Sequence, residues 1–224
     1  MSDRLLKFMF RGAPVRGELV RVTDAWREMT AHHQYPAPVK RLLGEMVAAA
    51  ALLASNIKFN GALVMQVHGD GPVKLLVVEC QPDLSLRATA KFSEDAVAAS
   101  ATMRELINRS GRGRFAITLD PRDPVPGQQP YQGIVPLDGD SMADVLESYM
   151  RQSEQLETRL YLAAQQRDKP TYDAALDFNC DFMDEPNLQL QKYLSHDRSA
   201  INYAQQTDRV LDDLFDKQSG ELDK

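Results

Sequence analysis

The sequence predicts an α+β protein in which mixed and antiparallel sheets pack around a central apolar helix, followed by a short, mainly helical acidic tail. Two observations predict this fold class. Segments with the periodicity of strands and of helices are mixed along residues 1–165, and hairpin-type turns separate several of the strands. One helical segment is apolar on nearly every side, which is typical of a helix buried inside a fold.

The strands are predicted from alternation and from β-branched and aromatic content. Within residues 62–68, Leu63, Met65 and Val67 alternate with more polar or smaller neighbours, and residues 73–78 are mostly apolar. The glycines and the proline of residues 69–72 indicate a tight turn between them. We expect strands at residues 4–10, 15–22, 62–68, 73–78, 84–92, 114–119, 131–136 and 158–163.

The clearest helix covers residues 38–57, with Pro38 in its first turn. Its apolar residues recur at helical spacing: Val39, Leu42, Leu43, Met46, Val47, Ala50, Leu53, Ala54 and Ile57. Alanines fill the other faces, so we expect sheet or a partner chain to cover this helix nearly all round. Shorter helices are expected at residues 25–33, at 103–108 and from Ser141, where Asp144 completes a capping pattern.

A change of composition marks a domain boundary. Residues 1–165 are expected to form a core domain, residues 166–171 a polar linker and residues 172–224 an acidic tail. Residues 170–224 carry 5 basic and 12 acidic side chains. Thr207 is expected to cap a short amphipathic helix in this tail, but the tail has little apolar surface from which to build a core of its own.

The chemistry-bearing residues form no catalytic or metal-binding motif. The histidines make no helical metal-binding pair, no serine lies in a nucleophile elbow, and Cys80 and Cys180 are a hundred positions apart. We therefore predict no catalytic, cofactor-binding or metal-binding residues, and a protein that is not an enzyme. The net charge of −6 argues against nucleic acid as a partner. Without a membrane-spanning run or a signal peptide, a cytoplasmic location is expected.

Three segments resemble the heat-shock protein 33 family of redox-regulated chaperones, and the resemblance covers most of residues 4–165. They read VRGELVRV at 15–22, YPAPVKRLLGEMVAAAALLASNIKFNGALVMQVHGDGPVKLLVVEC at 35–80 and YQGIVPLDGDSMADVLESYMRQSEQLETRLYLA at 131–163. The resemblance implies an ATP-independent holdase of the stress response, which binds unfolded proteins through apolar surface and prevents their aggregation. It supplies no catalytic residue to transfer.

The family's regulatory site does not transfer to this sequence. The resemblance implies a C-terminal domain in which the cysteines of a Cys-x-Cys and a Cys-x-x-Cys motif bind zinc in their reduced state. The sequence contains neither motif, so the four cysteine ligands of the family's zinc are absent. We therefore expect no cofactor, and an activity that lacks the redox switch.

The tail has a different resemblance. Residues 172–224 are similar to a C-terminal fragment of the extracellular peptide-binding proteins of ABC transporters, through DFMDEPNLQLQKY and the spacing INY, TD and LDDLFDKQ. The alternatives to a holdase are therefore a peptide-binding fragment of a transport protein and a non-functional fusion. The expected partners are unfolded or aggregation-prone clients and, through the alanine-rich helix, a second copy in a homodimer, with no nucleic acid and no membrane. The client-binding residues stay unknown at this stage, because a core face and a binding face have the same composition.

Overall fold

The computed structural model describes residues 3–9, 15–93, 96–124, 130–164 and 175–180, the last of these as backbone only. All described elements belong to one compact unit, Met1–Phe182. The second unit, Met183–Lys224, lies outside the described residues, and so do the linker expected at 166–171 and the tail helix expected after Thr207.

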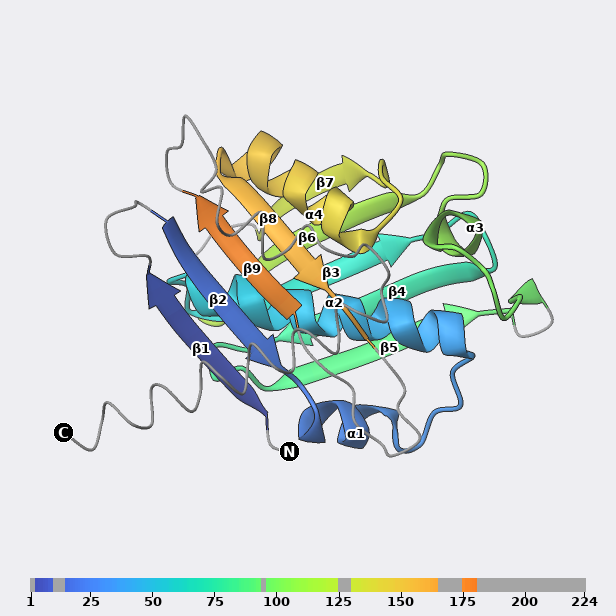
Figure 1. Ribbon diagram of the computed structural model, residues 1–224, viewed down its shortest axis with the longest axis horizontal. Helices are drawn as coiled ribbons and strands as arrows, with labels where there is room; N and C mark the ends of the chain where they lie inside the picture. The colour runs from blue at the N-terminus through green and yellow to red at the C-terminus, as the bar shows by residue number, and fades with distance from the viewer. Residues whose placement is uncertain (1–2, 10–14, 94–95, 125–129, 165–174, 181–224) are drawn as a thin grey trace, which may run out of the picture. The chain divides into compact units, whose positions relative to one another are not determined.

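The strands form two antiparallel sheets (Figure 1). The four-stranded sheet has the order β1 (Arg4–Met9), β2 (Val15–Arg21), β9 (Ala175–Cys180), β8 (Glu157–Leu162). The five-stranded sheet has the order β5 (Leu86–Phe92), β4 (Val73–Cys80), β3 (Gly61–His68), β6 (Arg114–Pro121), β7 (Tyr131–Pro136). Each expected strand is present, with ends that shift by a few residues.

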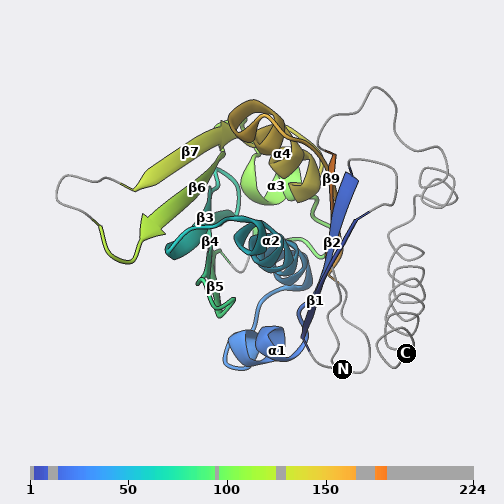
Figure 2. The ribbon, with the colours of Figure 1, turned by 90° about the vertical axis from the view of Figure 1, so that its left-hand side faces the viewer.

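Helix α2 (Ala37–Asn56) lies between the two sheets, as Figure 2 shows edge-on. It contacts β2, β8 and β9 on one side and β3, β4 and β5 on the other. Most of its residues are buried, including Leu43, Met46 and Ala49, each of which has no exposed surface. The prediction of a central helix covered by sheet is confirmed, and its alanines allow two sheets to approach one helix closely.

A cluster of polar side chains connects the four-stranded sheet to the C-terminal end of α2. Glu18 on β2 is nearly fully buried, and its carboxylate pairs with Lys7 Nζ on β1 at 2.7 Å and accepts a hydrogen bond from Ser55 Oγ of α2. Lys7 Nζ also donates to the Ser55 carbonyl oxygen at 2.6 Å. Because the buried carboxylate has both a cation and a hydroxyl as partners, the cost of removing it from water is offset.

Three short helices complete the unit: α1 (Asp24–Thr30), α3 (Met103–Ile107) and α4 (Met142–Tyr149). The capping pattern predicted at Ser141 is confirmed, since the Ser141 hydroxyl accepts from Asp144 N–H and the Asp144 carboxylate accepts from Ser141 N–H. Helix α4 continues into one π-helical turn, Met150–Glu154, which the periodicity did not predict. The turn ends at Gln155 in the left-handed conformation, with φ of 56°.

The turn between β3 and β4 is a structural turn, as predicted. Asp70 accepts hydrogen bonds from Ser110 Oγ at 2.7 Å and Arg112 N–H at 2.8 Å, which ties the turn to the segment after α3. The hydrogen bond from the Ser110 side chain is the main reason that the pKa of Asp70 falls to about 2. A permanently charged carboxylate at this point opposes binding of a phosphate.

Strand β9 is the main difference from the predicted organisation. Its backbone pairs with β2 on one side and β8 on the other, although residues 175–180 were expected to belong to the tail. Six residues of β2 pair with β9, from Val15↔Cys180 to Val20↔Ala175. Six residues of β8 pair with it on the other side, from Glu157↔Cys180 to Leu162↔Ala175. The described unit therefore extends beyond residue 165, because β9 fills the gap between two strands that are far apart in the sequence. Within the described residues, no helix is long and apolar enough to cross a membrane.

Candidate functional site

The two faces of the five-stranded sheet have different surroundings. On the inner face, Met65, Val78 and Ile117 are fully or almost fully buried and belong to the core around α2. Side chains alternate between the faces of a strand, so the intervening residues of β3, β4 and β6 point away from α2. No described helix or strand covers this outer face in Figure 2.

We give the name outer strip to five of the apolar residues on the outer face: Val64, Leu75, Val77, Ala116 and Ile134. Across the strands, Val77 is paired with Gln66, Gln66 with Ala116 and Ala116 with Ile134, so these side chains form one row. None of the five belongs to the hydrophobic core that the described residues form. Ala116 is only 4% exposed, so the accessible apolar surface of the strip comes from the other four residues, which the described core does not use.

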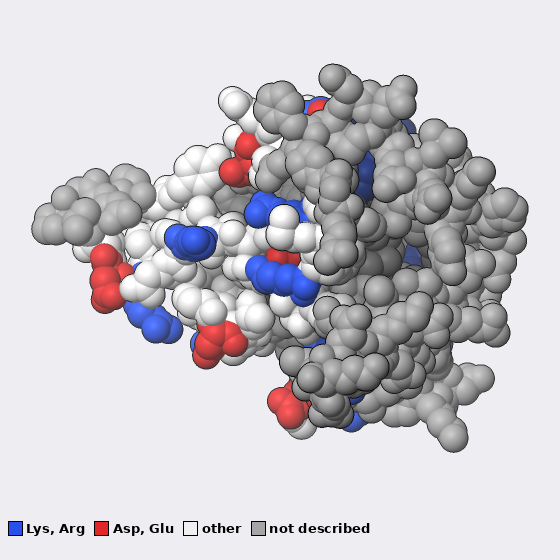
Figure 3. All heavy atoms as spheres, turned by 60° about the vertical axis from the view of Figure 1, so that its left-hand side comes forward, with Lys and Arg blue, Asp and Glu red and all other residues white. Residues whose placement is uncertain are grey.

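Polar and charged residues surround the outer strip. Its neighbours on the same face are Arg87, Thr89 and Lys91 of β5, Glu79 of β4, Gln66 and His68 of β3, Arg114, Thr118 and Asp120 of β6, and Gln132 of β7. A small apolar area with a charged rim is the usual form of a protein-binding surface. Figure 3 shows basic and acidic groups interspersed on the described part of one side of the molecule.

The outer strip reaches the edge of the sheet at β7. Ile134 is 60% exposed, and Tyr131, on the opposite face of the same strand, is 49% exposed. Between them, Gly133 lies against the Tyr149 ring of α4, and a Cβ added there would be 2.7 Å from Tyr149 Cε2. The Tyr149 hydroxyl donates to Glu154 at 2.8 Å, and burial raises the pKa of Tyr149. A neutral, anchored tyrosine thus supports β7 from the inner face.

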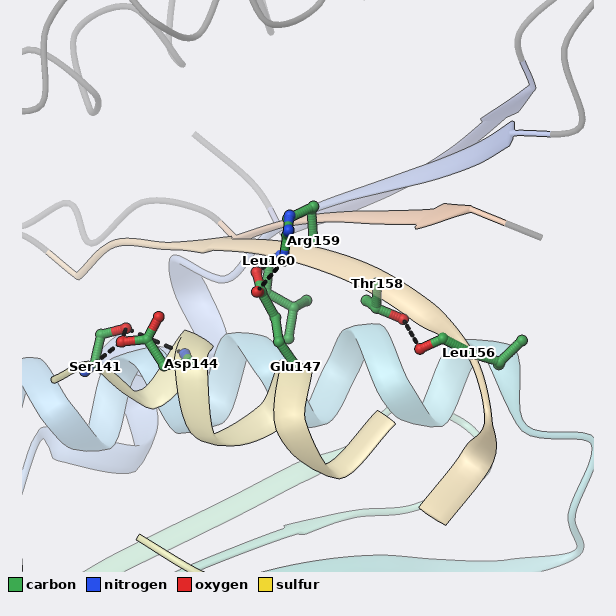
Figure 4. Close-up of polar contacts among 7 residues, drawn as sticks. All are labelled: Ser141, Asp144, Glu147, Leu156, Thr158, Arg159 and Leu160. Atoms are coloured by element: carbon green, nitrogen blue, oxygen red, sulfur yellow. Dashed lines mark hydrogen bonds and ion pairs between the residues drawn. The ribbon is translucent and has the colours of Figure 1, made fainter. Parts of the chain in front are cut away.

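The edge of the other sheet is protected at β8. Figure 4 shows Glu147 reaching from α4 to this strand, where its carboxylate accepts Leu160 N–H at 2.8 Å and pairs with Arg159 at 2.8 Å. The Leu160 N–H points away from β9, so without Glu147 it would be an unpaired donor on the strand edge. Arg159 is largely exposed, so the pair with it adds little stability. The backbone hydrogen bond is the more important contact.

Cys80 does not suit a zinc ligand. It is fully buried on β4, at a small hollow that Ile57, Phe59, Gln81 and Leu119 also line. Burial raises the pKa of its thiol to about 12, and the nearby Asp83 charge acts in the same direction. Zinc binds the thiolate, which this environment disfavours. The described residues contain no group of three His, Cys, Asp or Glu side chains arranged to hold a metal.

The outer strip was missed at the level of sequence, although part of the signal was present. The alternation in residues 62–68 separates Val64 from Leu63 and Met65, which predicts two different faces. Strand β4 gives no such separation, because Leu75 and Val77 alternate with residues that are equally apolar. The assignment of faces needed the register between strands, which a single sequence does not contain.

Comparison with known proteins decides the family. The family model described as Hsp33 protein matches residues 3–218. The chain belongs to the Hsp33 family. The match includes most of the segment in which we expected a tail unrelated to the family's zinc domain.

Relatives of this Hsp33 family chain include two proteins named 33 kDa chaperonin. The one from Methylobacillus flagellatus is 49% identical over 164 residues, which are 73% of this chain and 53% of that protein. The one from Chromobacterium violaceum is 48% identical over 162 residues, which are 72% of this chain and 53% of that protein. The chain spans about half the length of the curated relatives it matches.

A solved structure shares the fold. The crystal structure of the 33 kDa chaperonin from Thermotoga maritima matches with a TM-score of 0.72 at 16% identity, over 90% of this chain and 70% of that one. This likeness confirms the α+β fold of the Hsp33 family chain.

Proposed function

We propose that this chain is an ATP-independent holdase that binds unfolded proteins and prevents their aggregation, without catalysing a reaction. Membership of the Hsp33 family, whose relatives are named 33 kDa chaperonin, supports a chaperone. The outer strip supports it from the structure, since it is apolar surface outside the core that the described residues form. Unfolded proteins expose apolar side chains, and burial of each against such a surface is favourable by roughly 25 cal/mol per Å².

We place client binding on the outer strip. Its residues are already held in place by the strands, so binding does not require the chaperone to order a flexible segment. Its mixed charged rim fits clients of either sign, because Arg87 and Lys91 lie on one side and Asp120 on another. Such a surface selects for exposed apolar side chains and not for a sequence.

We also propose that binding does not depend on a zinc-thiol switch. The sequence contains two cysteines, Cys80 and Cys180. The burial of Cys80 and the pKa of about 12 of its thiol support this part of the proposal, because a protonated, enclosed thiol reacts slowly with peroxide.

The direct test measures light scattering of a heat-unfolding enzyme with the purified chain added, first in reductant and then after peroxide treatment. Suppression of scattering to a similar degree in both states is the expected result. A chain that remains folded and leaves the scattering unchanged in both states would contradict the holdase function. Activity in only one state would contradict the independence from redox conditions.

The position of the site is tested with Val77→Lys and Ile134→Lys. Each places a charge in the outer strip, and we expect roughly three- to tenfold more chain to be needed for equal suppression. Gln34→Lys, at an exposed position between α1 and α2, is the matched control and should behave as the native chain. Equal activity of all three variants would move the client site away from the outer strip.

A further inference from the structure

The register of the five-stranded sheet determines which backbone groups of β7 face outward. Arg122 N–H donates to the Asn60 carbonyl oxygen at 3.0 Å, and this pair continues the β3–β6 register. Hydrogen-bonded pairs alternate with non-bonded pairs in an antiparallel ladder. Even-numbered residues of β6 therefore turn their backbone groups toward β3, and odd-numbered residues turn theirs toward β7. In the β3–β4 ladder, Gly69 N–H donates to the Lys74 carbonyl oxygen at 3.0 Å, so odd-numbered residues of β3 turn their backbone groups toward β4. This agrees with even-numbered residues of β3 facing β6.

The same alternation extends into β7. Since Phe115 pairs with Val135 and Ile117 with Gly133, the backbone groups of Val135 and Gly133 face β6. The N–H and C=O groups of Gln132 and Ile134 then face the open edge. No described residue forms a hydrogen bond with them, and no described strand or helix lies along this edge. Pro136, which lacks an N–H, also falls at an outward position.

Strand β7 differs in charge from every other edge strand of the described sheets. The other edges carry Arg4 and Lys7 on β1, Arg87 and Lys91 on β5, and Glu157 and Arg159 on β8, the last of which α4 also covers. Strand β7 reads YQGIVP and has no charged residue. Charged side chains and covering helices are the usual protection of an edge against pairing with another strand. Three edges have this protection, whereas the only such device on β7 is Pro136, at the last residue of the strand.

The open edge is continuous with the outer strip. Ile134 contributes its side chain to the strip and its backbone groups to the edge, so a strand added beside β7 would enlarge the same apolar face. Tyr131 gives the added strand an apolar neighbour on the opposite face. Backbone hydrogen bonds do not depend on side-chain identity, which suits clients of many sequences.

We propose that the β7 edge binds an extended, uncharged segment of an unfolded client as an added strand, hydrogen-bonded to Gln132 and Ile134. This inference rests on the proposed holdase function and specifies the conformation in which the client is held. The client segment supplies backbone groups to the edge and alternate apolar side chains to the outer strip.

The deciding variant is Gln132→Pro, compared with Gln132→Val. Both lose the hydrogen bond from Gln132 Nε2 to Thr118 Oγ1, but only proline removes the outward N–H. Proline is tolerated on an edge strand where its nitrogen faces outward. With reduced and carboxymethylated α-lactalbumin as an unfolded probe, we expect Gln132→Pro to bind roughly three- to tenfold more weakly than Gln132→Val. Circular dichroism and thermal melting check that both variants are folded.

Hydrogen–deuterium exchange on the native chain gives a test that needs no variant. The Ile134 amide should exchange more slowly when the probe is bound, whereas the Val135 amide, already bonded to β6, should change little. A peptide of alternating valine and threonine should compete with the probe, and the same peptide N-methylated at every residue, which has no N–H on either edge, should not.

The outcomes separate this inference from the function on which it rests. If the native chain does not suppress aggregation, the holdase function is wrong. If it suppresses aggregation while Gln132→Pro equals Gln132→Val and the Ile134 amide is unaffected, strand addition alone is overturned. A Gln132→Pro variant that loses self-association in sedimentation but keeps probe binding would assign the edge to a second copy of the chain, which also overturns the proposal.

Discussion

At the scale of single residues, burial changes the ionisation of two side chains that lie away from the outer strip. The Cys80 thiol on β4 has its pKa raised to about 12. Glu45 on α2 has its pKa raised to about 7, chiefly by burial, while the Arg41 charge acts in the opposite direction. Both groups are therefore favoured in their neutral forms, which suits their position beside an apolar helix between two sheets.

The thiol of Cys80 should be inert in the folded chain. In a Cys180→Ser background, which leaves Cys80 as the only thiol, reaction with Ellman's reagent at pH 8 should be roughly a thousandfold slower than for an unperturbed cysteine, because so little thiolate is present. Addition of denaturant should restore the full rate. Fast reaction of the folded chain would contradict the burial of this side chain.

Glu45 should make stability depend on pH. Its pKa is higher in the folded chain than the usual 4.5, so its contribution is fully present below about pH 4.5 and is lost as the pH rises through about 7. Glu45→Gln removes the ionisation. We expect the free energy of unfolding at pH 8 to rise by about 1–3 kcal/mol. We also expect this free energy to depend less on pH between pH 4.5 and 8. Urea titrations across this range, with Arg41→Gln as a comparison, measure the change.

At the scale of elements, the edge strands β8 and β7 of the two sheets differ in how they are covered. Strand β8 is protected because α4 lies beside it and Glu147 accepts its Leu160 N–H, as Figure 4 shows. Strand β7 contacts α4 through Gly133 and Tyr131, both of which lie against Tyr149. Helix α4 therefore covers the edge of β8, whereas it supports β7 from the inner face and leaves the edge of β7 open.

Glu147 variants should separate the backbone contact from the ion pair. Glu147→Ala leaves the Leu160 N–H without its acceptor and should lower the free energy of unfolding by about 1–3 kcal/mol. Glu147→Gln keeps an acceptor oxygen and loses only the charge on the exposed Arg159, so its cost should stay below about 1 kcal/mol. Urea unfolding midpoints compare them. Equal losses for both variants would show that the charge, and not the hydrogen bond, is the important contact.

Gly133 should be required for the close contact of β7 with α4. Gly133→Ala places a Cβ at 2.7 Å from the Tyr149 ring, so the strand or the ring must move. We expect a loss of about 1–3 kcal/mol and a change in tyrosine fluorescence. A Tyr149→Leu background, in which the ring is absent, should reduce the loss and so serves as the control.

Local elements could be predicted from the sequence to a greater extent than their neighbours in space. The capping pattern of Ser141 and Asp144, the apolar periodicity of α2 and the alternation of β3 each depend on residues close together in the chain. Strand β9 depends on pairing with β2, more than 150 positions away in the sequence, and nothing in ALDFNC identifies that partner. The outer strip was missed for the same reason, since four strands must be aligned before its members come together.

At the scale of the whole unit, the fold has three layers, sheet, helix and sheet, with the core on both sides of α2. Such an arrangement leaves each sheet with one outer face. On the five-stranded sheet, that face carries the outer strip. The compact unit includes residues up to Phe182, so β9 is an integral part of the layer that covers α2 from the other side.

The position of β9 predicts where the chain tolerates truncation. A chain that ends after residue 182 keeps β9 and should unfold cooperatively. A chain that ends after residue 165 leaves the facing edges of β2 and β8 unpaired, so it should melt at a lower temperature and self-associate. Thermal circular dichroism and size-exclusion chromatography compare the two. Identical behaviour would place the boundary at 165 and make β9 dispensable.

The central position of β9 also bears on how the protein is made. Ribosomes release the N-terminus first, so β1, β2 and α2 emerge long before the strand that joins β2 to β8. Until residues 175–180 leave the exit tunnel, the four-stranded sheet cannot close over α2, and this apolar helix has one side open. We therefore expect a nascent chain of this protein to expose, until β9 has emerged, the kind of apolar surface that we propose it binds in others.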